Sequence, residues 1–182
     1  TKEEKQELID ELKDILYKKE KVYIEVCREN VELPKYANEG DAGMDVRAAE
    51  DVTVMPGETK VIPTGLKMAI PRGYEIQVRP RSGLSLKTPL RIANAPGTID
   101  SGYRDEIGIL ITNTSTAYES MEPYSIDEKG NKNGPYIIRA GDRIAQIVLC
   151  KYEKIEFESV DKGYITTLGT NRGGGFGSTG TK

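Results

Sequence analysis

The chain has 182 residues, enough for one domain of ordinary size with a hydrophobic core plus terminal extensions. Its 26 lysines and arginines against 29 aspartates and glutamates give a formal net charge of −3, so it lacks the broad basic footprint of a nucleic-acid-binding protein. The complete absence of histidine excludes Ser-His-Asp triads, Cys-His dyads and histidine-ligated zinc sites, so proton transfer has to use a carboxylate, tyrosine, lysine or water.

Cysteine usage and hydropathy indicate where the protein works. Cys27 and Cys150 are far apart and form no CxxC pair, so we expect each to be a small hydrophobic side chain in a reducing compartment. No stretch approaches the roughly 20 apolar residues that span a bilayer, and the first residues do not have the apolar segment of a signal peptide. We therefore expect a cytoplasmic protein with no membrane partner and no nucleic-acid partner.

Residues 1–21 predict an amphipathic helix whose composition differs from the rest of the chain. Thr1 and Glu4 have the spacing of a capping box. Apolar residues recur at three- and four-residue spacing on one helical face: Leu8, Ile9, Leu12, Ile15 and Leu16. Such a helix either docks on its own domain or serves as an oligomerisation or partner-binding element, and the sequence leaves both alternatives open.

From residue 22 to residue 168 the sequence is typical of many short β-strands. Alternating or β-branched runs separated by Pro/Gly turns occupy residues 22–26, 52–54, 59–62, 66–70, 74–78, 107–111, 137–138 and 144–149. This rhythm predicts an antiparallel barrel or jelly roll. Polar residues 114–136 interrupt it as a long excursion or hairpin, and the Gly-rich residues 169–182 form either a disordered tail or a flap that orders over a ligand.

Three segments contain residues that suit a phosphorylated ligand. Residues 79–84 combine two arginines, a serine and a glycine, which is the composition of an anion-binding turn or of an ordinary surface turn. The Gly-rich tail adds Arg172 and Ser178, although it has no Gly-Lys-Ser/Thr of a P-loop. A turn-rich hairpin over residues 97–103 contributes a carboxylate and an aromatic ring.

Aspartates are the candidates for proton transfer and cation binding. Because no histidine is present, Asp100 is the natural residue to orient and deprotonate a water, provided that it reaches the proton. Its alternative role is an Asx turn that stabilises the hairpin. Asp41 and Asp45 suit a hydrated cation or an arginine, and paired acids beside glycine also occur in ordinary loops.

Five motifs in one order make the chain resemble the trimeric deoxyuridine triphosphatase (dUTPase) family from about residue 22 to residue 180. They occupy residues 42–48, 80–84, 97–104, 141–146 and 172–180. The resemblance implies a mainly β, distorted jelly-roll barrel over residues 22–168, with a polar insertion at 114–136, an added N-terminal helix over 1–21 and a Gly-rich C-terminal flap over 169–182. It also implies a homotrimer with active sites at the subunit interfaces.

The same resemblance implies hydrolysis of dUTP to dUMP and pyrophosphate with Mg²⁺ as cofactor, which limits uracil incorporation into DNA and supplies dUMP for dTMP synthesis. Asp100 would activate the water that attacks the α-phosphorus, Asp45 would act on the metal indirectly through water, and Tyr103 would exclude a 2′-hydroxyl. A hairpin of fixed amides suits uracil and rejects cytosine, by about 10⁴-fold or more. The implied substrate-binding residues are Arg81, Ser82, Gly83, Asn94, Gly97, Thr98, Ile99, Tyr103, Gly108, Gln146, Arg172, Phe176, Gly177 and Ser178.

Departures from the family pattern leave further possibilities. Arg172 and Phe176 are one position closer together than is usual in the family, and residues 114–136 resemble the insertions of phage-type members, which would place the protein in the host cytoplasm. This insertion, or the helix over 1–21, is a candidate surface for a regulatory protein partner. The rival functions are a dCTP deaminase of the same fold, which would release ammonia from dCTP, and a non-catalytic jelly-roll regulatory module.

Overall fold

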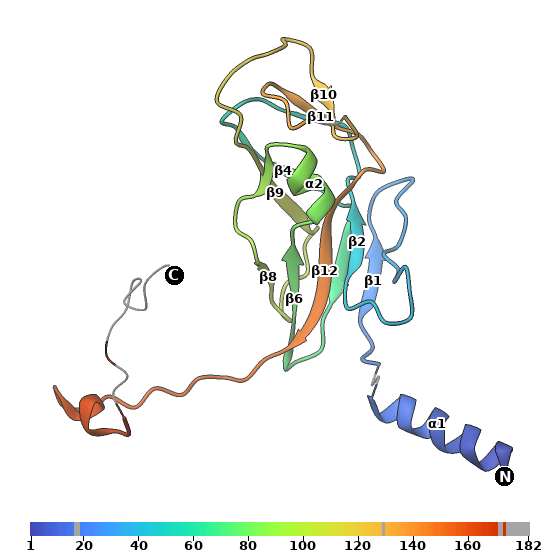
Figure 1. Ribbon diagram of the computed structural model, residues 1–182, viewed down its shortest axis with the longest axis vertical. Coiled ribbons are helices and arrows are strands. Elements are labelled where there is room, and N and C mark those ends of the chain that lie inside the picture. Colours follow the sequence, from blue (N-terminus) through green and yellow to red (C-terminus); the bar gives the residue numbers. More distant parts are fainter. Residues whose placement is uncertain (17–18, 129, 171–172, 174–182) are drawn as a thin grey trace. The chain divides into compact units, whose positions relative to one another are not determined.

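The computed structural model describes residues 1–16, 19–128, 130–170 and 173, and the chain divides into two units, Thr1–Tyr152 and Glu153–Lys182 (Figure 1). The elements of the first unit are α1 (Lys2–Leu16), β1 (Tyr23–Val26), β2 (Met44–Arg47), β3 (Val52–Val54), β4 (Thr59–Pro63), β5 (Leu66–Ala69), β6 (Tyr74–Arg79), α2 (Ser82–Lys87), β7 (Leu90–Ile92), β8 (Gly97–Ile99), β9 (Gly108–Asn113), β10 (Tyr124–Ser125), β11 (Tyr136–Ile138) and β12 (Arg143–Lys151). The described part of the second unit contains one 3₁₀ turn, η1 (Tyr164–Thr167).

Helix α1 begins as the capping box predicts, because the Glu4 amide donates a hydrogen bond to the Thr1 hydroxyl at 3.2 Å. The predicted helix over 1–21 is a helix over Lys2–Leu16 in the structure, and residues 17 and 18 lie outside the described residues. Leu8, Ile9 and Leu12 are about half exposed. The apolar stripe of α1 is thus only partly covered in a single copy. No described helix is long and apolar enough to cross a membrane.

The described strands form four sheets, so the mainly β fold expected from the sequence is confirmed. The largest has the order β2-β12-β6-β8, and a second has the order β4-β9-β7. Two smaller sheets pair β1 with β5 and place β11 between β10 and β3. All pairs are antiparallel except β10 with β11, which is parallel. Antiparallel order lets one face of each sheet cover the core and the other face meet solvent.

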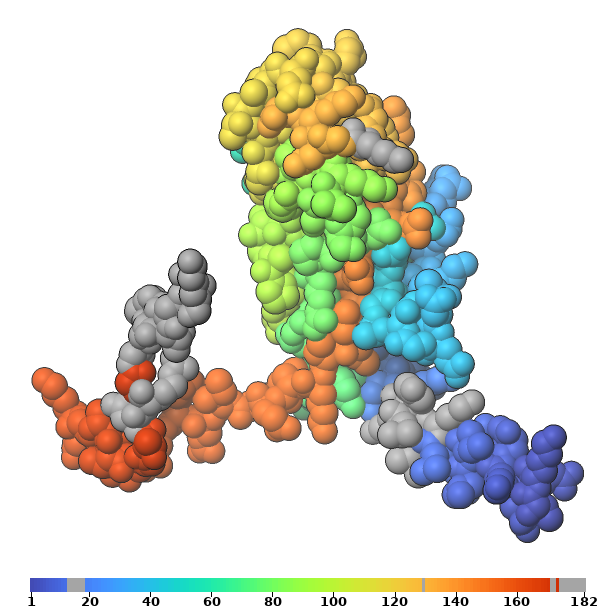
Figure 2. Space-filling view, viewed as in Figure 1, coloured from blue at the N-terminus to red at the C-terminus, as the bar shows by residue number. Residues whose placement is uncertain are grey.

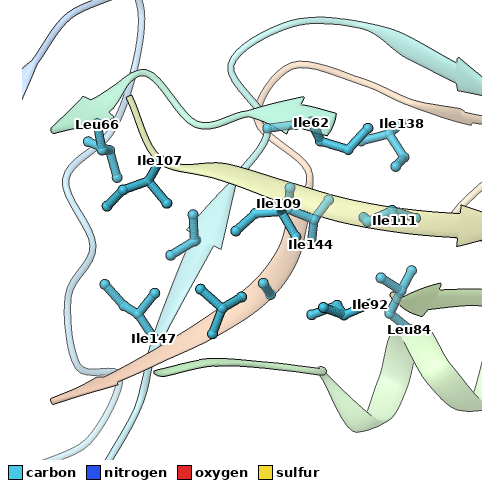
Figure 3. Packing of buried hydrophobic residues seen from close by; sticks show 14 of the residues in the cluster. Ile62, Leu66, Leu84, Ile92, Ile107, Ile109, Ile111, Ile138, Ile144 and Ile147 are labelled. Carbon is cyan, nitrogen blue, oxygen red and sulfur yellow. The ribbon is translucent and has the colours of Figure 1, made fainter. Parts of the chain in front are cut away.

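The core lies between the β2-β12-β6-β8 sheet and the β4-β9-β7 sheet (Figure 3). Strand β9 alternates buried and less buried residues, and its Ile109 and Ile111 are 1% exposed. Ile144 and Ile147 of β12, at 0% and 2% exposure, are buried in the same cluster. Full burial of each such side chain contributes about 1.5–3 kcal/mol, so these branched residues hold the two sheets together.

Helix α2 is a difference from the sequence prediction, which treated residues 79–84 as a turn. It spans six residues, and its Leu84 is 8% exposed and belongs to the core cluster. The amide and hydroxyl of Thr88 both donate to the Leu84 carbonyl, at 3.0 and 2.8 Å, and end the helix. One buried leucine within a polar segment is therefore enough to fix this helix beside the barrel.

The insertion, residues 114–136, is attached to the barrel through a buried asparagine. Asn113 is 0% exposed, and its side-chain amide donates to the carbonyls of Val54 and Gly134 at 2.9 and 2.8 Å. The Tyr124 and Tyr136 rings lie 5.6 Å apart, and the Lys132 ammonium stands 4.8 Å from the centre of the Tyr124 ring. The yellow to light-orange surface of Figure 2 shows the insertion gathered at one end of the first unit.

Candidate active site

A cavity of about 420 Å³ opens at the start of α2, beside β2, β12 and β6. Five of the site residues that the family resemblance implies line it: Asp45, Arg81, Ser82, Gly83 and Gln146. The remaining lining residues are Lys35, Ala37, Asp41, Ala42, Gly43, Arg79 and Val148. The structure thus brings three separate motifs together around one hollow.

Strand register explains why these residues meet. In β12, Gln146 pairs with Asp45 of β2 on one side and with Arg79 of β6 on the other. Gly43 keeps the cavity open, because a Cβ there would lie 3.0 Å from the Gln146 Oε1 and 3.3 Å from a methyl group of Val148. A side chain at this position would press on the wall of the cavity.

Asp45 fixes the orientation of Arg81. The Nε of Arg81 donates to Oδ1 of Asp45 at 2.8 Å, and Nη1 of Arg143 donates to Oδ2 at 3.3 Å. Nη1 of Arg81 also donates to the Arg143 carbonyl at 2.9 Å. With Nε and Nη1 engaged, Nη2 of Arg81 has no hydrogen-bond partner among the described residues. Arg81 is therefore a preoriented cation that retains a donor for a ligand.

The charges of the cavity favour an anion. Lys35, Arg79 and Arg81 line it against two carboxylates, and both carboxylates are already engaged. Asp45 has the arginine contacts above, and Asp41 accepts hydrogen bonds from the amide and side chain of Asn38 at 2.8 and 3.1 Å. Ser82 and Gly83 begin α2, where the first amides of a helix have no intrahelical acceptor. Cations, a hydroxyl and open amides together suit phosphate oxygens.

The side chains of the cavity also indicate how a metal ion would be held. The described residues contain no group of three Asp, Glu, Cys or His side chains that could cage one. Asp41 and Asp45 are the two carboxylates of the cavity. Because Mg²⁺ usually keeps several waters and is bound through substrate phosphates and one or two carboxylates, these residues fit a magnesium ion that arrives with a nucleotide.

The hairpin predicted at residues 97–103 begins with β8, which pairs with β6. Ile99 is buried whereas Asn94, Thr98 and Asp100 are exposed, and Gly97 packs so closely that a Cβ would lie 3.2 Å from the Asn94 side chain. The Tyr103 amide donates to the Asp100 carbonyl at 3.0 Å and closes the turn. The Tyr103 hydroxyl donates to the carbonyl of Glu106 at 3.0 Å, which fixes the ring.

The hairpin and the cavity do not meet within one copy. None of residues 94–103 lines the cavity. Because Ile99 pairs with Ile76, Asp100 comes level with Glu75, about 13 Å along β6 from Arg79 at the usual rise of about 3.3 Å per residue. An aspartate and one bound water do not cover that distance.

Two further predictions concern residues elsewhere in the chain. Gly108 lies in β9 opposite Pro63, where a Cβ would meet a methyl group of Val61 at 2.4 Å, so packing between β4 and β9 already requires glycine. Arg172, Phe176, Gly177 and Ser178 lie outside the described residues. The sequence reasoning missed Lys35, which has no motif around it, and the contact of Arg143, which stands inside the fourth motif.

Comparisons with known proteins agree with this arrangement. A family model described as dUTPase matches residues 29–120. The deoxyuridine 5'-triphosphate nucleotidohydrolase of Fusobacterium nucleatum is 47% identical over 163 residues, which cover 88% of this chain and 98% of that protein.

Solved structures of phage proteins share the fold. A variant of the Staphylococcus bacteriophage 80alpha dUTPase with dUpNHpp is 32% identical with a TM-score of 0.77, over 89% of this chain and 99% of that one. The 80alpha protein is described among phage dUTPases that control transfer of virulence genes by a proto-oncogenic G protein-like mechanism. A dUTPase variant from phage phi11 of S. aureus, described as coordinating a structural Mg(II) ion, is 33% identical with a TM-score of 0.70, over 79% of this chain and 99% of that one. With these relatives and its own cavity and hairpin, the chain belongs to the dUTPase family.

Proposed function

We propose that the chain hydrolyses dUTP to dUMP and pyrophosphate in active sites that are each completed by a neighbouring copy of the chain. The observation that carries this proposal is the preoriented Arg81 in a cation-lined cavity, which stands apart from the exposed carboxylate of Asp100. A triphosphate fits the cavity, and a water-activating aspartate fits the hairpin. Bringing two copies together supplies both.

The cavity holds the phosphates in this proposal. Arg81, with its Nε on Asp45, directs its remaining donor to a phosphate oxygen, and Ser82 and Gly83 offer a hydroxyl and helix-start amides. Gln146 adds an amide from β12. Bound Mg²⁺ supplies positive charge to the phosphate oxygens, and Asp41 and Asp45 are the carboxylates that would hold its water shell. Phosphoryl transfer depends mainly on such positioning and charge stabilisation.

The hairpin supplies the general base and the selectivity for deoxyribose and uracil. The Asp100 carboxylate accepts no hydrogen bond from the described residues, so it is available to orient a water and take its proton as the water attacks the α-phosphorus. Tyr103, held by its hydroxyl, presents its ring to the deoxyribose and leaves no room for a 2′-hydroxyl. Main-chain groups of residues 97–99, with Asn94 nearby, pair with uracil. Arg172, Phe176, Gly177 and Ser178 close over the ligand in the same proposal.

Two observations support assembly, which by family resemblance is a homotrimer. The first is the distance of about 13 Å along β6 between the level of Asp100 and Arg79, which lines the cavity. The second is that the unit Glu153–Lys182, taken by itself, buries none of its described residues 153–170, so it has no core of its own to cover Ile155 and Phe157. Large apolar side chains left in water mark surfaces that another chain covers.

The experiment is a pyrophosphate assay across dUTP, dCTP, dATP, dGTP and dTTP with Mg²⁺. We expect release from dUTP alone, and we expect Asp100→Asn to lower the rate by orders of magnitude while the oligomer persists. Asp105→Asn is the matched control, because it removes an exposed carboxylate just after the same hairpin and should leave the rate unchanged. Ammonia from dCTP would establish the deaminase instead, and full activity of Asp100→Asn would remove Asp100 from the mechanism.

We further propose that the insertion binds a regulatory protein partner. Its Met121 and Tyr118 are 76% and 52% exposed, although Asn113 and the tyrosine pair hold its base rigidly. A rigid loop with exposed apolar side chains suits protein recognition. Alanine at both positions should leave dUTP hydrolysis intact and abolish binding of a partner captured by the wild-type protein. Retention of every partner by the double variant would contradict this role and leave the helix over 1–21 as the candidate.

A further inference from the structure

A salt-bridge network that no sequence motif singled out fastens the end of the Asp100–Glu106 segment. Nε of Arg28 donates to Oε1 of Glu106 at 2.7 Å, and Nη2 donates to Oε2 at 2.9 Å. The remaining Nη1 donates to Glu50 at 2.8 Å. The two parallel bonds to Glu106 form the planar fork that arginine makes with a carboxylate, and a lysine does not reproduce it.

Glu106 is held by more than Arg28. Its Oε1 also accepts a hydrogen bond from the Gly65 amide at 2.8 Å, and its side chain is only 25% exposed. The hydrogen bonds from Arg28 are the main reason that the pKa of Glu106 lies below its usual value. The carboxylate thus stays charged and the contact stays formed at neutral pH.

The backbone next to Glu106 is clamped as well. Ile107 is 3% exposed, and its amide donates to the Leu66 carbonyl at 2.8 Å. The Ile107 carbonyl accepts hydrogen bonds from the amide and hydroxyl of Thr64 at 3.2 and 2.7 Å. Residues 106–107 are therefore fixed to the turn between β4 and β5, and Arg28 adds the N-terminal segment that follows β1.

Tyr103 takes its position from this clamp. Its hydroxyl donates to the carbonyl of Glu106, the same residue whose side chain Arg28 holds. Residues 100 and 102–105 are exposed, so the core contributes little to their placement. The hairpin is thus supported by β8 at one end and by the Arg28–Glu106 pair at the other.

We propose that Arg28 and Glu106 are positioning residues for dUTP hydrolysis, which hold the hairpin so that Tyr103 meets the sugar and Asp100 meets the water. The inference rests on the proposed roles of Tyr103 and Asp100. Neither positioning residue touches the substrate. Their contribution is to keep the hairpin in one geometry, and a small misplacement of catalytic groups is costly in rate.

The test measures kcat and KM for dUTP and for UTP in Arg28→Lys, Arg28→Ala and Glu106→Gln. Glu50→Gln is the matched control, because it removes the third contact of Arg28 and leaves the fork on Glu106 intact. We expect Glu106→Gln and Arg28→Ala to lower kcat/KM for dUTP by about tenfold or more, because misplacement of catalytic groups by about 1 Å can cost on the order of 100-fold in rate. The preference for dUTP over UTP should shrink in both variants and persist in Glu50→Gln. Arg28→Lys should fall between wild type and Arg28→Ala.

The double variant Arg28→Ala/Glu106→Gln should be no worse than the worse single variant, because the contact between Arg28 and Glu106 is the one through which both residues position the hairpin. The inference is overturned if the variants keep wild-type kcat/KM and wild-type dUTP/UTP preference at a temperature where circular dichroism shows them folded. A lowered melting temperature with an unchanged preference for dUTP over UTP also overturns the inference, because a salt bridge that only stabilises the fold would give that result. If Arg28→Ala fails to fold, Glu106→Gln and Arg28→Lys decide the question. Inactivity of the wild type on dUTP would instead refute the proposed function.

Discussion

Removing the negative charge of Asp45 tests the preorientation of Arg81. Asp45→Asn keeps the size of the side chain but replaces a charge-assisted hydrogen bond of 2.8 Å by a neutral one. Such bonds contribute about 1.5–3 kcal/mol when charged and about 0.5–1.5 kcal/mol when neutral. The difference of about 1–2 kcal/mol corresponds to a loss of about 5- to 30-fold in an equilibrium or rate constant.

The partial burial of Arg81 and Asp45 supports a loss of activity within this 5- to 30-fold range. The side chains of Arg81 and Asp45 are 26% and 31% exposed, so water replaces the lost contact only in part. Arg143 is 53% exposed and 3.3 Å from Asp45, and such an exposed pair adds little. We therefore expect kcat/KM for dUTP to fall about tenfold, as the triphosphate meets a less ordered Arg81.

The assay is pyrophosphate release under steady-state conditions with saturating Mg²⁺. Glu32→Gln is the control, because Glu32 is 68% exposed and forms a 3.4 Å pair with Arg47 outside the cavity. This control should not change kcat/KM. An Asp45→Asn enzyme with wild-type kcat/KM would refute the reasoning that Asp45 orients Arg81.

Three further predictions concern the scaffold. Asn113→Ala removes the side-chain partner of the Val54 carbonyl and of the Ser115 amide, and leaves the Gly134 carbonyl with only the Ser115 hydroxyl at 3.3 Å, so it should lower the free energy of unfolding in urea by about 3 kcal/mol. A loss below about 1 kcal/mol would contradict this. Gly65→Ala forces a Cβ to within 2.5 Å of a Val31 methyl group at a φ of +69°, so its melting temperature should fall further than that of Gly57→Ala, where φ is +76° and the space is open. The Arg28 contact lowers the pKa of Glu106, so it stabilises the protein above pH of about 4.3 and is lost as pH falls through the lowered pKa. The difference in unfolding free energy between wild type and Glu106→Gln should therefore be constant near pH 7 and shrink in acid; a difference that grows in acid would contradict the assignment.

Local pattern was sufficient to predict much of the fold. The alternation in residues 107–111 predicted the strand that is β9, because one buried face of a sheet requires apolar residues at every second position. The spacing of Thr1 and Glu4 predicted the start of α1 for a similarly local reason. Composition alone indicated the segment of Arg81 as an anion-binding turn, the family resemblance implied Gln146, and both residues line the cavity.

Features that depend on contacts between distant parts of the chain could not be predicted from the sequence. Strand β8 lies in the hairpin predicted from the sequence, but its three residues are too few to establish a strand pattern. Helix α2 contains Leu84, which belongs to the core cluster. Arg28 and Glu106 are 78 residues apart, so no local pattern joins them. Lys35 lines the cavity from a loop without any distinguishing signal. In each case the deciding partner is distant in the chain.

The central claim is that one copy supplies the aspartate and another supplies the phosphate cavity, and subunit mixing tests it directly. Asp100→Asn and Arg81→Ala should each be nearly inactive as pure oligomers. Mixed oligomers, formed by co-expression and isolated through two different tags, should contain sites with both residues intact. In the homotrimer that the family resemblance implies, one site in three of every mixed trimer has both residues intact, so the isolated mixed trimers should regain about a third of the wild-type activity per site. Mixed oligomers as inactive as both parents would contradict the claim.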